Sequence, residues 1–130
     1  MPEFSERSHC RAPAEEVWKL LHDPARFPDW WAGTERVEPG GDGAVTRYLD
    51  GWPDFPMPTA VTSRREAGAI VISCLRSDIV HEWTLSPAED GCDVAVRVTI
   101  PEEEAARLDP VRAEVLASMA RLVEVAQAAA

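Results

Sequence analysis

The last part of the chain, residues 109–126, carries a helical pattern that limits how everything before it can fold. Asp109 followed by Pro110 is a favourable helix start, because the aspartate can accept a bond from a free amide and proline has no amide to leave unpaired. Apolar residues then recur at spacings of three and four: Val111, Val115, Leu116, Met119, Leu122, Val123 and Ala126. An isolated helix of this length is marginal in water, so this stripe must pack against a broad apolar surface.

Composition restricts the class of protein. The chain has 130 residues, which suits one domain over residues 1–130 with a single core. It carries 23 acidic and 13 basic side chains, a net charge of −10, which repels phosphate backbones and anionic lipids. We therefore expect no nucleic-acid partner and no membrane insertion. Because no apolar run is long enough to span a bilayer and the N-terminus lacks a signal pattern, we expect a cytoplasmic protein.

The residues that commonly hold metals and cofactors lack the necessary spacing. Cys10, Cys74 and Cys92 are odd in number, far apart and outside any CxxC motif, which predicts buried reduced thiols. The histidines show no ligand spacing with them, and no glycine-rich loop opens a helix after a strand. We therefore expect neither a metal nor a cofactor.

Ahead of the C-terminal helix, the sequence predicts one strand, two short helices and then a series of strands. Residues 3–11 alternate as a strand. Pro13 opens a helix that ends at Asp23, and Pro24 opens a second, shorter one. Beyond Gly33 the helical period disappears, and the spacing of turn residues is typical of an antiparallel meander. The predicted strands are residues 34–37, 44–50, 59–65, 69–75, 79–85 and 92–100.

Residues 51–58 interrupt this rhythm. Their three prolines exclude a central strand, and Trp52 and Phe55 make the segment unusually apolar. Two interpretations remain open: the segment is a lid over a site, or its aromatic rings plug the end of the core. A separate turn is expected at the glycine-rich residues 39–43.

Alternation in the last two predicted strands identifies their inward faces. The even positions of the last strand are apolar, as are the odd positions of the strand before it, apart from His81. If Leu85 pairs with Cys92, then His81 faces Val96 and the two apolar faces lie on the same side of the sheet. His81 is therefore expected to point inward.

Three groups of residues, taken with this order of elements, make nearly the whole chain similar to a known superfamily. They are Ala12-Pro13 with Val17-Trp18, Leu21, Asp23-Pro24 and Trp30, then Trp83-Thr84-Leu85-Ser86-Pro87, and then Gly91-Cys92-Asp93-Val94. The chain resembles the START-like, Bet v 1-like (SRPBCC) superfamily, in its polyketide cyclase/dehydrase-type branch. The resemblance implies an α+β helix-grip fold: a curved antiparallel sheet of about seven strands around a long C-terminal helix, with two short helices after the first strand.

The resemblance also implies a cavity between the sheet and the C-terminal helix. A strongly curved sheet cannot touch a straight helix along its whole length, which agrees with that expectation. Apolar walls with a few polar points suit a small-molecule pocket. The expected ligand-binding residues are Trp30, Trp31, Tyr48, Ile72, His81, Trp83, Val96, Leu116, Met119, Ala120 and Val123.

His81 is the candidate for the polar point of this pocket. It could bond to a ligand oxygen or, in an enzyme, transfer a proton. The competing interpretation is a core histidine whose hydrogen bonds are satisfied within the protein. A second polar residue is left undecided, because either Arg47 or the pair Tyr48 and Asp50 faces inward from residues 44–50.

Three classes of function remain open. We favour binding of a small, largely hydrophobic ligand, such as a lipid or an aromatic or polyketide-like molecule, in the internal cavity. The second is a polyketide cyclase or dehydratase that uses His81 as its acid/base, together with another polar group. The third is a co-chaperone-like or antitoxin-like interaction module with a vestigial cavity. Whether the chain is a monomer or a homodimer is left open.

Overall fold

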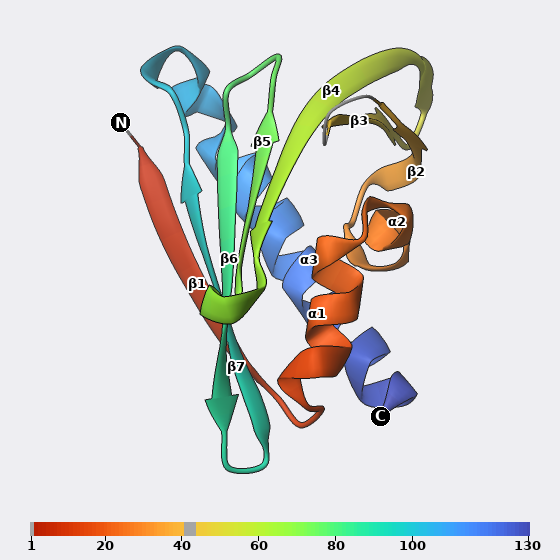
Figure 1. The fold of residues 1–130 in the computed structure, drawn as a ribbon. Helices are drawn as coiled ribbons and strands as arrows, with labels where there is room; N and C mark the ends of the chain where they lie inside the picture. Colours follow the sequence, from red (N-terminus) through yellow and green to blue (C-terminus); the bar gives the residue numbers. More distant parts are fainter. Residues whose placement is uncertain (1, 41–43) are drawn as a thin grey trace.

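Residues 2–40 and 44–130, as the computed structural model describes them, form one antiparallel sheet that curves around a long helix (Figure 1). Within these residues the order along the sheet is β1-β7-β6-β5-β4-β3-β2, which confirms the helix-grip fold. The turn predicted at residues 39–43 falls partly on residues 41–43, which lie outside the described residues. The strands are β1 (Glu3–Cys10), β2 (Thr34–Pro39), β3 (Ala44–Leu49), β4 (Trp52–Arg64), β5 (Ala69–Cys74), β6 (Val80–Ala88) and β7 (Gly91–Thr99).

The helices also follow the predicted order. They are α1 (Ala14–His22), the 3-10 turn η1 (Pro24–Arg26), α2 (Phe27–Trp30), and at the C-terminus η3 (Glu102–Arg107) and α3 (Leu108–Ala129), with η2 (Arg65–Ala67) between β4 and β5. The prediction that Asp109 caps the last helix is wrong. The preceding 3-10 turn runs directly into α3, so Arg107 takes the cap position without a side-chain bond and Asp109 lies in the first turn.

The inward faces of β6 and β7 are confirmed, but the predicted pairing of the two strands is wrong by two residues. Leu85 lies opposite Val94, not Cys92, because both strands continue to a tighter turn between Ala88 and Gly91. A slip of two residues keeps every side chain on its face. Gly91 is required at this turn: its φ is +153°, and a Cβ atom there would collide with the carbonyl oxygen of Cys10 in β1.

The prediction that residues 51–58 form no central strand needs correction, because they begin β4. Trp52 and the residues from Met57 onward pair with β3, whereas pairing with β5 starts only at Thr59. Pro53 and Pro56 therefore lie where the strand has a partner on one side at most, and Pro58 meets the β5 side through its carbonyl, which accepts from the amide of Leu75 at 2.9 Å, so the missing amides cost little. Trp52 and Phe55 are 63% and 45% exposed, so these rings do not plug the core.

One face of α3 covers the concave side of the sheet, and its phase differs in part from the prediction. Leu116, expected on the apolar face, is 46% exposed, and Ala120 is exposed as well. Ser118 takes a buried place instead, where its hydroxyl donates to the carbonyl of Glu114 and accepts from the amide of Ala32. The buried residues of the helix are Val115, Ser118, Met119, Leu122 and Ala126.

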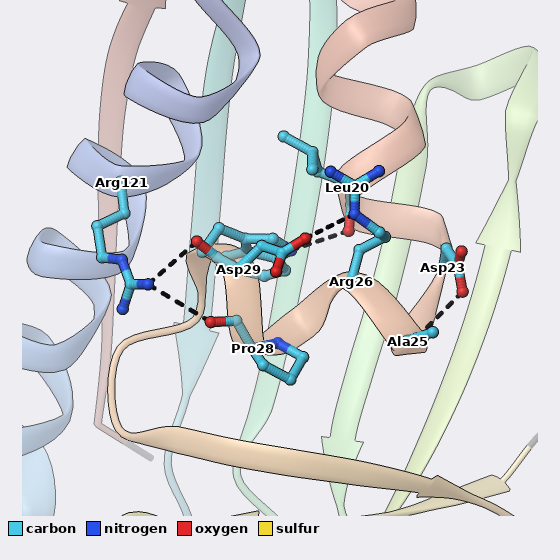
Figure 2. Close-up of polar contacts among 8 residues, drawn as sticks. Leu20, Asp23, Ala25, Arg26, Pro28, Asp29 and Arg121 are labelled. Atoms are coloured by element: carbon cyan, nitrogen blue, oxygen red, sulfur yellow. Dashed lines mark hydrogen bonds and ion pairs between the residues drawn. The ribbon is translucent and has the colours of Figure 1, made fainter. Parts of the chain in front are cut away.

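The corner formed by α1 and α2 inserts aromatic rings between the sheet and α3. Figure 2 shows how the corner is held: Arg121 of α3 donates to the carbonyl oxygens of Pro28 and Asp29, at 3.4 and 3.1 Å. The indole of Trp30 donates to the carbonyl of Leu20 at 2.8 Å, which satisfies its one polar atom inside the core. The tryptophans at the end of α2 are thereby fixed in the space that the sheet and α3 enclose.

Candidate functional site

A cavity of about 100 Å³ lies between the sheet and the first half of α3. In Figure 1 this is the upper end of the molecule, where α3 begins and where β5 turns into β6. Ligand pockets usually measure roughly 300–1,000 Å³, so this cavity admits only a small chemical group. It is lined by Trp31, Arg47, Leu49, Met57, Thr59, Cys74, Ser77, Ile79, His81, Arg107, Val111 and Glu114.

Wider pockets open on the outer surface, but none of the described residues that line them has a buried side-chain nitrogen or oxygen without a hydrogen-bond partner. One of about 660 Å³ lies over Ser5, Glu82 and Arg97 on the outer face of the sheet. In the described part of the chain, the buried side-chain atoms without a hydrogen-bond partner belong to a single residue, His81, which lines the smaller cavity. This smaller cavity is therefore the candidate site.

β6 places His81 in the cavity wall, opposite Ile72 of β5 and Val98 of β7. The residue is only 7% exposed, and neither Nδ1 nor Nε2 has a partner among the described residues. This contradicts the interpretation of His81 as a satisfied core histidine. Burial, reinforced by the charge of Arg47, lowers the pKa of His81 to about 4. The ring is therefore neutral at pH 7 and offers one donor and one acceptor.

Arg47 is the residue of β3 that faces inward, which decides the alternative left open by alternation. Its Nε donates to Oγ1 of Thr34 at 2.6 Å, and its Nη2 donates to Oε1 of Glu114 at 3.3 Å. Within residues 2–40 and 44–130, its Nη1 makes no hydrogen bond. Burial lowers the pKa of Arg47 and the charge of Glu114 opposes that effect, so the guanidinium stays charged.

Trp31 connects the polar residues of the site. Its Nε1 donates to Oε1 of Glu114 at 2.8 Å, and the guanidinium carbon of Arg47 lies 3.6 Å from the centre of its ring. The ring of His81 meets it edge to face, with the ring centres 5.5 Å apart. Because the next residue, Ala32, is bonded to Ser118 of α3, the indole is held against the helix. Trp31 therefore positions both Arg47 and His81.

Sheet curvature brings Arg47 and His81 together. They come from β3 and β6, which are separated by β4 and β5. In a flat sheet three strand spacings would keep them roughly 14 Å apart. Here both side chains contact Trp31, because the concave face turns them toward a common centre.

The structure places the predicted site residues in three different environments. Trp31 and His81 line the cavity. Trp30, Ile72, Trp83, Val96 and Met119 are buried in the apolar core instead. The rings of Trp30 and Trp83 pack edge to face at 5.4 Å. These rings fill much of the space that was expected to be empty, and the remaining cavity is correspondingly small.

The other predicted residues lie away from the cavity. Tyr48 faces outward, where its hydroxyl bonds to Glu38 at 3.1 Å. Leu116 and Ala120 are exposed on α3, and Val123 is partly buried against the core. Tyr48 was misplaced because the sequence left the inward face of β3 undecided. Leu116, Ala120 and Val123 were misplaced because the buried face of α3 is rotated relative to the predicted one.

Several lining residues were not identified from the sequence, namely Thr59, Ser77, Arg107 and Glu114. Glu114 is informative because it lies four residues before Ser118, so the two polar residues share one side of α3. A polar pair on an otherwise apolar side was a signal that could have indicated the site. Nothing in the local sequence marks Ser77 or Arg107, which reach the cavity from a turn and from η3.

Other chemistry is not indicated by the described residues. Among them, no group of three or more His, Cys, Asp and Glu side chains is placed to hold a metal ion. Cys10 and Cys92 face each other across β1 and β7 as free thiols, and burial raises the pKa of Cys92 to about 11. Across residues 2–40 and 44–130, no helix has the length and apolar character needed to cross a membrane.

Comparisons with known proteins agree with this architecture. Residues 1–128 match a family model described as polyketide cyclase / dehydrase and lipid transport. No curated protein matches the sequence significantly. A crystal structure of a protein from Chromobacterium violaceum is similar with a TM-score of 0.78 at 14% identity, covering 98% of this chain and 99% of that one.

Two further solved structures extend the comparison. A protein from Bacillus halodurans gives a TM-score of 0.73 at 16% identity, with 97% of each chain covered. The di-domain ARO/CYC protein BexL, from the BE-7585A biosynthetic pathway, gives 0.78 at 18% identity over 95% of this chain and 46% of BexL. At these identities the similarity to solved structures shows a shared fold.

Proposed function

Because the chain belongs to the polyketide cyclase/dehydrase and lipid transport family, we propose that it binds a small, largely hydrophobic ligand at the cavity between the sheet and α3. His81 and Arg47 orient a polar group of this ligand. The family supports a ligand-binding or cyclase role, and the site residues favour the first of these.

The observation that carries the proposal is the unpaired state of His81. Both ring nitrogens are buried without a partner in the described residues, beside a guanidinium of Arg47 that has an unused Nη1. A buried polar group without a hydrogen bond costs roughly 1–3 kcal/mol. A ligand oxygen that bonds to His81 recovers this free energy, whereas an apolar side chain in its place would have avoided the cost.

The same residue argues against the cyclase alternative. A general acid/base works best when its pKa lies near the operating pH. Burial lowers the pKa of His81 to about 4, so the ring holds little protonated acid at pH 7. Within the described residues no carboxylate bonds to the ring to raise that pKa. Binding therefore has more support than proton transfer.

A thermal-shift screen with fatty acids, aromatic polyketides and sterol-like compounds tests the proposal. A ligand that binds only the folded state raises Tm. In His81→Phe the affinity for oxygen-bearing ligands should fall about twofold to tenfold, the value of one hydrogen bond, with little change for purely apolar ligands. Tyr48→Phe is the matched control, because that side chain faces outward. If no compound raises Tm, ligand binding is rejected in favour of an interaction module; if compounds bind but His81→Phe leaves every affinity unchanged, the role of His81 is rejected.

A further inference from the structure

Two guanidinium groups, those of Arg47 and Arg107, line the cavity of a chain whose net charge is −10. Each forms an ion pair: Arg47 lies 3.3 Å from Glu114, and Arg107 lies 2.7 Å from Glu104, which is outside the lining. His81 is neutral. The unpaired Nη1 of Arg47 is a donor that suits an anionic oxygen. The cavity therefore favours an acidic group over a neutral one.

The size of the cavity limits how much of a ligand can enter. Its volume of about 100 Å³ compares with a share of roughly 30 Å³ per water molecule in liquid. This leaves room for a group the size of a carboxylate and its first carbon. Behind Trp31 the stacked ring of Trp30, 5.8 Å away, and then Trp83 close the interior. An apolar body cannot extend inward, so it must leave through the mouth.

Exposed apolar side chains lie next to the lining residues at that mouth. Trp52 pairs with Leu49, and Phe55 precedes Met57 by two residues; Leu49 and Met57 both line the cavity. The rings of Trp52 and Phe55 are 6.4 Å apart, in edge-to-face geometry. Arg76 fixes this arrangement, with its guanidinium carbon 4.5 Å from the Phe55 ring centre. We call Trp52 and Phe55 the rim.

The rim is suited to a small molecule more than to a peptide strand. An added strand would need amide donors along β4, but Pro53, Pro56 and Pro58 have none. The distance also fits a small ligand. Arg47 and Leu49 are two residues apart on β3, which corresponds to roughly 7 Å, and Leu49 lies opposite Trp52. A chain of several carbons covers that span.

From these observations we infer that the ligand is an acidic amphiphile whose anionic head enters the cavity at Arg47 and His81 while its apolar body lies outside, across Trp52 and Phe55. This inference rests on the proposed function and adds the class of ligand and its orientation. The apolar body binds on the surface of β4, and the buried core does not receive it.

Acetate and octanoate, followed by the indole N–H resonances in ¹⁵N NMR spectra, test this arrangement. Acetate provides the head alone and should shift the Trp31 resonance but not that of Trp52, which is assigned from its loss in Trp52→Ala. Octanoate should shift both. Trp30, whose indole is bonded to Leu20 inside the core, is an internal control that should move with neither. If octanoate shifts the Trp31 resonance but not the Trp52 resonance, the apolar body does not bind at the rim and the inference is rejected, while the proposed function stands.

Affinities measured by calorimetry provide the second readout. Each buried methylene is worth about fourfold in affinity, so octanoate should bind the wild-type chain at least tenfold more tightly than acetate. The double substitution Trp52→Ala/Phe55→Ala should remove most of this gain and leave acetate binding unchanged. Leu116→Ala, which truncates an exposed apolar residue on α3 outside the cavity lining, should change neither.

Octanol tests the requirement for an acidic head. It should bind at least tenfold more weakly than octanoate, and equal affinities would overturn the acidic head while leaving hydrophobic binding in place. If the double rim variant binds octanoate as tightly as the wild-type chain, the outward orientation is wrong. If no probe shifts Trp31 in the wild-type chain, the inference is rejected, and the thermal-shift screen then decides the proposed function separately.

Discussion

The two parts of the space between the sheet and α3 differ although neighbouring residues build them. Trp30 and Trp31 are adjacent and stacked at 5.8 Å, yet Trp30 faces Trp83 and completes the apolar core, while Trp31 contacts Arg47, Glu114 and His81. One part is filled by rings, and the other keeps a cavity with unpaired polar atoms. Enclosure by a curved sheet is therefore not enough to make a binding site. Whether a cavity remains depends on the side chains that occupy the enclosed space.

The largest expected effect lies in the filled part. Trp83→Ala should lower the free energy of unfolding by about 3–5 kcal/mol, because the ring is buried and its removal leaves a large void. Urea denaturation followed by circular dichroism measures the change. A loss below about 1 kcal/mol would mean that the core is loosely packed there, and that the two parts differ less than the structure indicates.

The part that contains the cavity should make the stability of the protein depend on pH. The pKa of His81 is about 4 in the folded protein and 6.5 in an unfolded chain, so the unfolded state takes up a proton between these values and the folded state does not. Stability should therefore fall as pH decreases, with His81 contributing a loss of about 2 kcal/mol between pH 7.5 and pH 5. Denaturation midpoints across this range measure the slope.

The difference between the pH dependence of stability in the wild-type chain and in His81→Phe isolates the contribution of His81, because the other titratable groups are present in both proteins. His9 acts in the opposite direction: hydrogen bonding to Asp93 is the main cause that raises its pKa, which favours the folded state as pH falls. His9 remains present in the variant. An equally steep slope in the wild-type chain and in His81→Phe would contradict the assignment of the pH response to His81.

At constant neutral pH, His81→Phe should itself raise the free energy of unfolding by about 1 kcal/mol. The substitution removes two buried nitrogens without partners and keeps an aromatic ring against Trp31. Chemical denaturation at pH 7.5 measures it. Marked destabilisation would show that the ring nitrogens form hydrogen bonds in solution. The part around the cavity would then have no unpaired polar atoms, like the part that is filled by rings.

The smallest effect is expected at the rim. Trp52→Ala should change the free energy of unfolding by less than about 0.5 kcal/mol, because the side chain is mostly exposed. The same denaturation experiment on Trp83→Ala provides the contrast between two tryptophans of one chain. A loss near that of Trp83→Ala would place Trp52 in the core rather than at the surface.

Patterns along single elements predicted much of this molecule. Alternation was sufficient to place Trp83 and His81 on the inward face, because the period of a strand fixes its faces even when the register slips by two residues. The direction of Arg47 was beyond such reasoning, since both faces of β3 carry polar side chains. Its neighbours Thr34 and Glu114 come from the adjacent strand β2 and from α3, and only the folded chain brings them into contact.

The size of the cavity was not predictable for a related reason. A curved sheet over a straight helix indicates a gap, but the gap closes where the α2 corner inserts Trp30. Segment 51–58 shows the limit of a local rule. Proline excludes a strand only where a neighbouring strand requires the amide at that position, and the presence of such a neighbour is a property of the whole sheet.

The pairing of β1 with β7 has a consequence for the synthesis of the protein. The first strand made has no partner until the last strand is complete, because Glu3 pairs with Thr99 and Cys10 pairs with Cys92. At a translation rate of 5–20 residues per second, the newly emerged N-terminal segment waits roughly 5–20 s for its partner. The sheet therefore closes only after β7 has left the ribosome, and until then the amides of β1 have no strand partner and are open to other cellular proteins.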